Sequence, residues 1–239
     1  MALHASTLPL HAPARAWLLQ AARWFLLAFL LAIYPLALRL PESLSWENGW
    51  LERTQLAMLI IGFLGAAWMR SDLRRGTSDP RAPSTRQTVL RLSLIAMAFW
   101  LMCAGRETSW GATFLTRGVM EADGPYFSSS KLWYHMAIKP LVLLAVGAAA
   151  LAFVYWRLDR PLLALMRQRR FPWAELALVV TAAVMSTLSE SSMFFEDSAP
   201  EALRMLVEEL AEMGCYFGLL LMQTRLFIAL GAPSGADAD

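Results

Sequence analysis

The most hydrophobic stretches of this chain are too short to cross a bilayer unless charged residues enter the membrane with them. A transmembrane helix needs about 20 mostly apolar residues. Four segments are free of charge over a shorter length: Thr54 to Met69, Leu92 to Gly105, Leu176 to Ser189, and Met213 to Thr224. Each reaches spanning length only by including neighbouring charges. Because an unpaired ionisable group is costly at that depth, we expect function to lie at these segment ends.

The composition is that of a polytopic membrane protein. Hydrophobic residues make up 57% of the 239 residues, and ten of the residues are tryptophan. We predict an all-α fold, a six-helix transmembrane bundle. The two cysteines, Cys103 and Cys215, are interpreted as small buried hydrophobes rather than as a bonded pair. The expected helices are Ala22 to Leu40, Leu51 to Met69, Thr88 to Glu107, Met136 to Trp156, Trp173 to Phe194 and Ala202 to Leu230.

The arginines predict the orientation of the bundle. They crowd the linkers from Arg70 to Arg91 and from Arg157 to Arg170, so the positive-inside rule places both linkers, and both termini, in the cytoplasm. The expected location is the bacterial inner membrane. Residues 1–15 are expected to form a cytoplasmic arm, residues 16–230 the transmembrane domain and residues 231–239 a disordered tail. Residues 77–88 are expected to form a mobile loop.

The same topology sends most acidic residues to the opposite, periplasmic half. We therefore expect any functional site to face the periplasm. These residues are Glu42, Glu47, Glu52, Glu107, Glu121, Asp123, Glu190, Glu196, Asp197, Glu201, Glu208, Glu209 and Glu212.

A first candidate lies at the start of the second helix. Glu52 and Gln55 are three residues apart and share one helix face, and Asn48 with Gly49 is a plausible helix start. Glu52 could also simply pair with Arg53 at the headgroups. We expect the side chain of Glu47 to be solvated, because carboxylates in loops usually are.

A second candidate is the densest polar cluster of the chain, at the outer end of the third helix. Arg106, Glu107, Ser109, Trp110 and Gly111 predict a local turn that offers donors, an acceptor and a stacking face. The alternative is ordinary interface chemistry, with a belt tryptophan and an arginine that reaches the headgroups.

A third candidate precedes the fourth helix. Lys131, His135 and Lys139 are spaced four apart and would line one face if the helix already runs at Lys131. His135 is the single histidine outside the N-terminal arm. It could act as a general base or metal ligand, or only form a structural hydrogen bond.

The last two helices carry the remaining candidates. Glu190 lies near the end of the fifth helix with Ser186 one turn before it, whereas Glu196 and Asp197 are expected in water. Glu208 and Glu212 share one face of the sixth helix with Cys215, and Glu209 and Tyr216 lie aside. Such a pair of like charges needs a cation, a shared proton or Arg106 to offset it.

Two further predictions concern the sixth helix. Residues 200–213 could instead lie on the membrane surface as a separate amphipathic helix. Gly214 and Gly218 form a GxxxG pair, which predicts close helix packing.

The stretch from Glu47 to Gly111 resembles an uncharacterised group of bacterial polytopic membrane proteins. The likeness lies in a Glu-Asn-Gly element followed by Glu and Gln, and in a Glu-x-Ser-Trp-Gly element. It implies a shared site on the outer face without naming its chemistry. The chain departs from the group with Arg106 in place of an acidic residue and Ala112 in place of Gln. The matching residues are Glu47, Asn48, Gly49, Glu52, Gln55, Glu107, Ser109, Trp110 and Gly111.

The leading hypothesis is a metal-assisted enzyme that acts on a lipid or lipid-linked headgroup. One internal histidine cannot build a His-rich zinc site like that of ceramidase-like hydrolases, so a divalent metal would need a mainly carboxylate shell. Membrane lipids are the expected partners, with no nucleic acid; a protein partner or homo-oligomer stays open. The alternatives are a proton- or cation-coupled transporter and a scaffold subunit. Expected catalytic residues are Glu107, His135 and Arg106; metal ligands Glu52, Glu190, Glu208 and Glu212; substrate-binding residues Gln55, Trp110 and Lys131.

Overall fold

Six long helices dominate the computed structural model, which describes residues 12–75, 83–121, 124–191 and 200–231. All six are long and apolar enough to cross a membrane, which is the pattern of a multi-pass membrane protein. The predicted all-helical, six-segment organisation is confirmed at that level. The long helices are α1 (Ala12–Ala37), α2 (Trp50–Arg75), α3 (Pro83–Glu107), α5 (His135–Tyr155), α7 (Trp173–Glu190) and α8 (Glu201–Gly231).

Short elements connect the long helices. The β1 and β2 strands pair antiparallel, with Val119 opposite Tyr126. Two short helices, α4 and α6, and three 3-10 turns complete the described part of the chain. Their bounds are α4 Ala112–Leu115, β1 Val119–Glu121, β2 Gly124–Tyr126, α6 Asp159–Arg167, and the 3-10 turns Glu42–Leu44, Ser109–Gly111 and Ser129–Lys131.

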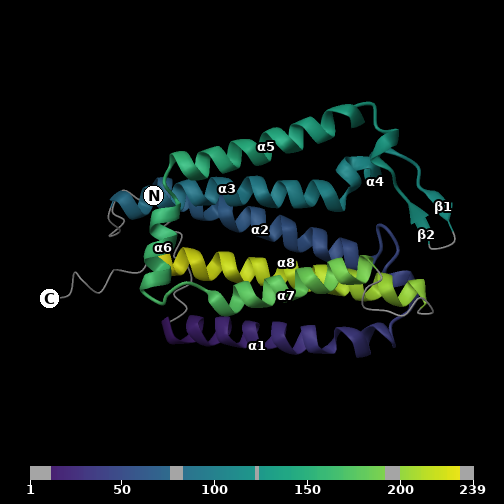
Figure 1. Cartoon of the computed structure of the whole chain (residues 1–239), viewed down its shortest axis with the longest axis horizontal. Coiled ribbons are helices and arrows are strands. Elements are labelled where there is room, and N and C mark those ends of the chain that lie inside the picture. The colour runs from purple at the N-terminus through teal and green to yellow at the C-terminus, as the bar shows by residue number, and fades with distance from the viewer. Residues whose placement is uncertain (1–11, 76–82, 122–123, 192–199, 232–239) are drawn as a thin grey trace, which may run out of the picture.

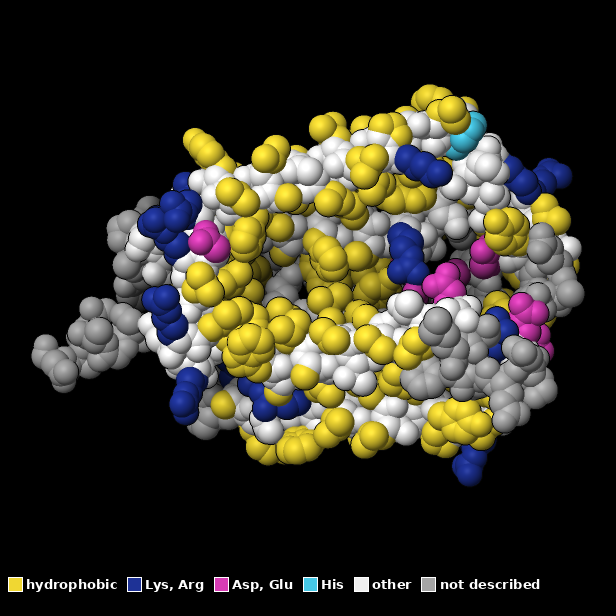
Figure 2. Space-filling model, in the orientation of Figure 1, with side chains coloured by type: hydrophobic (Ala, Val, Ile, Leu, Met, Phe, Trp, Pro, Cys, Tyr) yellow, Lys and Arg dark blue, Asp and Glu magenta, His cyan; other side chains and the backbone are white. Residues whose placement is uncertain are grey.

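Helix α8 is the centre of the bundle. It packs against α7, α1, α2 and α3, while α5 lies along α3 (Figure 1). Helices α2 and α8 begin, and α3 and α7 end, at the end of the bundle that carries α4 and the β-hairpin. We call this the carboxylate end. The opposite end, beside α6, is the arginine end. Figure 2 shows most of the visible acidic side chains gathered at the carboxylate end, whereas Lys and Arg side chains lie at both ends.

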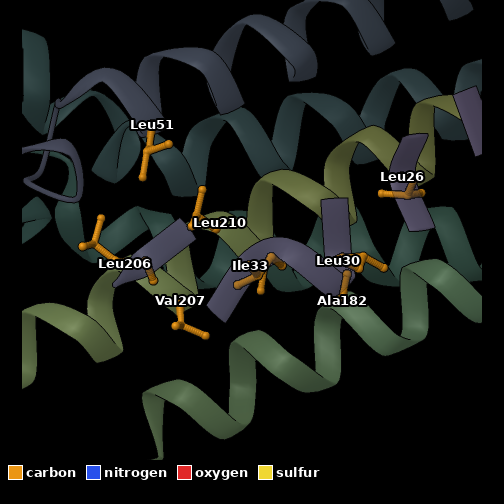
Figure 3. Packing of buried hydrophobic residues seen from close by; sticks show 10 residues of the cluster. Leu26, Leu30, Ile33, Leu51, Ala182, Leu206, Val207 and Leu210 are labelled. Carbon is orange, nitrogen blue, oxygen red and sulfur yellow. The ribbon is translucent and has the colours of Figure 1, made fainter. Parts of the chain in front are cut away.

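The largest apolar cluster lies between α1, α7 and α8. Leu26, Leu30 and Ile33 project from α1 toward Leu210 of α8 and Ala182 of α7 (Figure 3). Burial of such side chains stabilises a fold by roughly 1.5–3 kcal/mol each in water. Between helices in lipid, close van der Waals packing matters more.

Small residues of α8 permit this packing. A Cβ atom added to Gly214 would lie 2.8 Å from Leu30 Cδ2, and one added to Gly218 would lie 2.7 Å from Val179 Cγ2. The GxxxG pair therefore faces α1 and α7, as its spacing predicts. Cys103 and Cys215 are both free thiols and half-buried.

The structure corrects several sequence-based expectations. Helix α1 begins at Ala12, ahead of the expected start at Ala22, and α3 begins at Pro83, inside the expected loop. The linker after α5 contains α6, which was not predicted; it is amphipathic and buries Leu165. Predictions for Glu196, Asp197, Asp123 and the tail after Gly231 fall on residues outside the described ranges.

The α8 helix decides between two alternatives that the sequence left open. It runs without interruption from Glu201 to Gly231 and buries Leu206, Val207 and Leu210 in the first half. A separate amphipathic helix over residues 200–213 is therefore wrong, because this segment packs inside the bundle rather than beside it.

Candidate functional site

The start of α2 places Glu52 at the carboxylate end. Asn48 adopts a left-handed backbone conformation, with φ of 59°, and its backbone N–H donates to Glu52 Oε2 at 2.5 Å. A carboxylate in the first turn also suits the positive end of the helix dipole. The side chain of Arg53 reaches back to Asn48 Oδ1 at 3.4 Å. Glu52 is thus fixed by the backbone before its own helix.

Glu47 is not the freely solvated carboxylate that we expected. It is half-buried, and its Oε2 accepts a hydrogen bond from the backbone N–H of Phe127. This contact ties the loop after α1 to the segment that follows the hairpin. The sequence separation of 80 residues explains why no local pattern indicated it.

One turn further along α2, Gln55 is fully buried and faces α8. Its Nε2 donates to the Glu209 carbonyl at 2.8 Å and to Glu209 Oε2 at 2.9 Å. The remaining oxygen, Gln55 Oε1, is buried and has no hydrogen-bond partner among the described residues. A buried acceptor of this kind can receive a donor from a ligand or water.

Glu107, at the end of α3, points to the same interior. The hydroxyl of Tyr216 donates to Glu107 Oε1 at 2.5 Å. Glu52, Glu107, Glu209 and Glu212 lie within electrostatic reach of one another. The bundle therefore collects carboxylates from three helices in one polar layer.

Arg106 neutralises one of these charges. Its Nη2 lies 2.6 Å from Glu212 Oε1, and the Ser186 hydroxyl donates to the same oxygen at 3.4 Å. Of the three ways to offset the repulsion on α8 that the sequence left open, the structure contains the ion pair with Arg106. Glu208 interacts electrostatically with Glu212, Glu190 and Arg106. Glu190 itself is exposed at the last residue of α7.

The Ser109–Gly111 turn after α3 has the expected compact shape. Ser109, Trp110 and Gly111 all have positive φ, a backbone conformation that costs non-glycine residues roughly 1–2 kcal/mol each. The Trp110 ring lies over Gly105, where an added Cβ would be 2.7 Å from it, and the Trp110 carbonyl accepts from the Tyr134 hydroxyl at 2.7 Å. The Trp110 ring therefore packs on α3.

The third candidate group does not form one helix face. Helix α5 begins at His135, and Lys131 ends a separate 3-10 turn, so the assumption of a helix from Lys131 is wrong. His135 is exposed, and its Nδ1 lies 2.9 Å from the Leu132 carbonyl in its own turn. Neither residue lines the pocket described next.

A pocket of about 330 Å³ opens beside Glu52 and Glu107. Its volume falls in the lower part of the range for small-molecule sites. Two carboxylates, one guanidinium, one amide and two hydroxyls supply its polar groups. The lining residues are Asn48, Glu52, Arg53, Leu56, Glu107, Thr108, Thr113 and Phe114. Arg53, Thr108 and Thr113 were not predicted, because nothing in their local sequence marks them as pocket residues.

The four predicted metal ligands are not gathered into one shell. In the described ranges, no three His, Cys, Asp or Glu side chains are grouped closely enough to hold a metal ion. Glu52 lines the pocket, while Glu208, Glu212 and Glu190 lie toward α7. A divalent metal at Glu52 and Glu107 would need further oxygen ligands from water or a phosphate, as is common for Mg²⁺.

Comparisons of this chain with protein-family models, with curated proteins and with solved structures return no match.

Proposed function

We propose that this membrane protein binds the zwitterionic headgroup of a lipid or lipid-linked molecule in the carboxylate-end pocket. A headgroup that carries both an ammonium and a phosphate, such as phosphoethanolamine, matches the polar groups of the pocket. The proposal rests on one observation: Glu52, Glu107 and Arg53 line the same pocket. The carboxylates suit the ammonium, and the guanidinium suits the phosphate.

The packing beneath the pocket favours a one-sided site over a transport path. One turn beyond Gln55, Leu59 is fully buried, and Trp100 beside it has 2% of its surface exposed. The next polar residue, Gln223, is engaged by Trp100 Nε1 at 2.6 Å and by the Gly62 carbonyl at 3.2 Å. A proton- or cation-coupled transporter needs a continuous polar route, which this apolar layer interrupts.

The inward direction of two carboxylates favours a pocket over a docking surface. A scaffold subunit would present its charges away from the bundle axis. Here the Glu209 carboxylate accepts a hydrogen bond from Gln55 of α2, and the Glu107 carboxylate accepts one from Tyr216 of α8. Both contacts turn the acidic groups toward other helices.

By the positive-inside rule, the proposal places the carboxylate end in the periplasm and the arginine end in the cytoplasm of a bacterial inner membrane. The pocket would then meet headgroups of the outer leaflet of that membrane. Catalysis by Glu107, with or without a divalent metal, stays a prediction, as do the roles of His135, Arg106, Trp110 and Lys131 in it.

The proposal is tested by calorimetric titration of the detergent-purified protein with O-phosphoethanolamine. We expect saturable binding that weakens about tenfold in Glu52→Gln, Glu107→Gln and Arg53→Gln, because each loses one charge-assisted contact. Glu42→Gln, an exposed carboxylate in a 3-10 turn at the same end, is the matched control and should bind like the parent. Equal affinities in Glu52→Gln, Glu107→Gln and Glu42→Gln would reject the pocket as the site.

A further inference from the structure

A second and larger pocket lies at the arginine end, remote from the carboxylates. Its volume is about 920 Å³, and α1, the segment before α7, and the last turns of α8 form its walls. Five of its lining residues are arginines and one is a glutamate. The arginines are Arg15, Arg23, Arg169, Arg170 and Arg225.

Glu175 fixes two of these arginines in place. This residue is fully buried, and its Oε1 lies 2.8 Å from Arg23 Nε and 2.6 Å from Arg225 Nε. The Arg225 N–H is directed off the line to the oxygen, so this second contact is an ion pair rather than a hydrogen bond. A guanidinium has five N–H donors in a rigid fork. One shared oxygen therefore orients both forks and leaves most of their donors for a ligand.

The charge of the lining is strongly positive. Five guanidinium groups against one carboxylate give 5 − 1 = +4 for the residues that form the pocket. The 18-residue helix α7 begins at Trp173 in the same wall, and no side-chain hydrogen bond caps this end of the helix. The partial positive charge of a helix N-terminus adds to that of the arginines. The charge of the lining therefore favours an anionic ligand.

The remaining lining residues indicate that the ligand is amphiphilic. Leu19, Phe171, Trp173 and Ile228 give the pocket apolar walls beside the arginines. The volume is far larger than a bare phosphate needs, and Trp173 is half exposed, as is common for tryptophans at the interface of a membrane. Basic pockets between transmembrane helices are known to bind the headgroups of anionic lipids.

We propose that the arginine-end pocket binds a phosphate ester, supplied by the headgroup of an anionic phospholipid. The arginines hold the phosphate oxygens by charge-assisted hydrogen bonds, and the apolar walls contact the glycerol and the first methylene groups of the chains. This site is independent of the headgroup pocket at the carboxylate end, because the two lie at opposite ends of the bundle and share no residue.

Two turns of the chain provide a matched pair of variants. Arg169 follows α6 and has a φ of 56°, and Arg157 follows α5 with a φ of 54°. Glycine adopts this left-handed conformation without strain, so Arg→Gly is tolerated by the backbone at both positions. Arg169 lines the pocket, whereas Arg157 does not and lies 4.0 Å from Asp159. Both substitutions remove one arginine from a left-handed turn, but only Arg169→Gly removes a guanidinium from the pocket.

The experiment is calorimetric titration of the purified full chain with three soluble probes: dihexanoyl phosphatidylglycerol, dihexanoyl phosphatidylcholine and glycerol 1-phosphate. We expect the phosphatidylglycerol to bind more tightly than the choline lipid. Its affinity should fall about tenfold in Arg169→Gly and in Arg15→Gln, and stay at the parent value in Arg157→Gly.

The outcomes separate the two sources of phosphate. Glycerol 1-phosphate that binds as tightly as phosphatidylglycerol, with the same loss in Arg169→Gly, would support the phosphate site and assign it to a soluble ester instead of a lipid. Equal affinity for the choline and glycerol lipids would overturn the proposal. So would an equal loss in Arg169→Gly and Arg157→Gly, or no binding of either anionic probe.

Discussion

The Tyr216 hydroxyl donates a 2.5 Å hydrogen bond to Glu107 Oε1 and so joins α8 to α3 across 109 residues of sequence. Both residues belong to the polar layer of the carboxylate end. Directly beneath them lie Leu59 and Trp100, which are almost completely buried. This hydrogen bond orients the Glu107 carboxylate. It also gives the Tyr216 hydroxyl a partner next to the apolar layer.

Tyr216→Phe should therefore destabilise the protein. The variant leaves the Glu107 carboxylate without its donor, at a cost of about 1–3 kcal/mol. Thermal unfolding in detergent measures this loss, and O-phosphoethanolamine binding should weaken as well, because Glu107 is no longer held at the pocket. Tyr155→Phe is the control, since the Tyr155 side chain is 84% exposed. Equal unfolding temperatures for the two variants would contradict the prediction.

Gln55→Leu should also be costly, because it removes the donor to the backbone carbonyl and to Oε2 of Glu209. The substitution leaves the half-buried Glu209 carboxylate without its amide donor, and we expect a loss of about 1–3 kcal/mol. Adding Glu209→Gln to this variant should restore part of the stability, since a neutral amide is less costly to bury than a charge. A double variant no more stable than Gln55→Leu alone would argue against this pairing.

The ion pairs of Glu175 predict a third effect. Arg225→Met removes one of two cations from a fully buried carboxylate, and breaking such a pair typically costs about 3–5 kcal/mol. The second change Glu175→Gln should recover much of that loss by removing the uncompensated charge. Chemical denaturation of the single and double variants forms a double-mutant cycle that measures the coupling. Additive effects of the two substitutions on the free energy of unfolding would refute the ion pair between Arg225 and Glu175.

Two glycines provide a fourth, paired prediction. Gly218→Ala places a Cβ 2.7 Å from Val179 Cγ2 and should destabilise the contact of α8 with α7 by about 1–3 kcal/mol. Gly147→Ala on α5 has no atom within 4 Å of the added Cβ. It should be neutral or stabilise the helix by about 0.5–1 kcal/mol. Opposite signs in unfolding temperature are expected, and a loss of the same size in both would contradict the packing.

The sequence predicted the helices well because their signal is local. Apolar length and composition alone indicate each span, and the small residues Gly214 and Gly218 indicate which face of α8 packs closely. The candidate site was predicted less completely. Gln55, Glu107 and Glu209 were recognised as polar residues in apolar surroundings, but Arg53, Thr108 and Thr113 gave no such signal.

What the sequence by itself determined is the number of spanning segments and the separation of acidic from basic residues along the chain, since both depend on composition within one segment. Only the tertiary structure decided which charges meet. The rotation of α8 against α2, α3 and α7 pairs Glu209 with Gln55, Glu107 with Tyr216, and Glu175 with Arg225. Such contacts join residues distant in sequence and depend on how whole helices pack, which no short window of residues encodes.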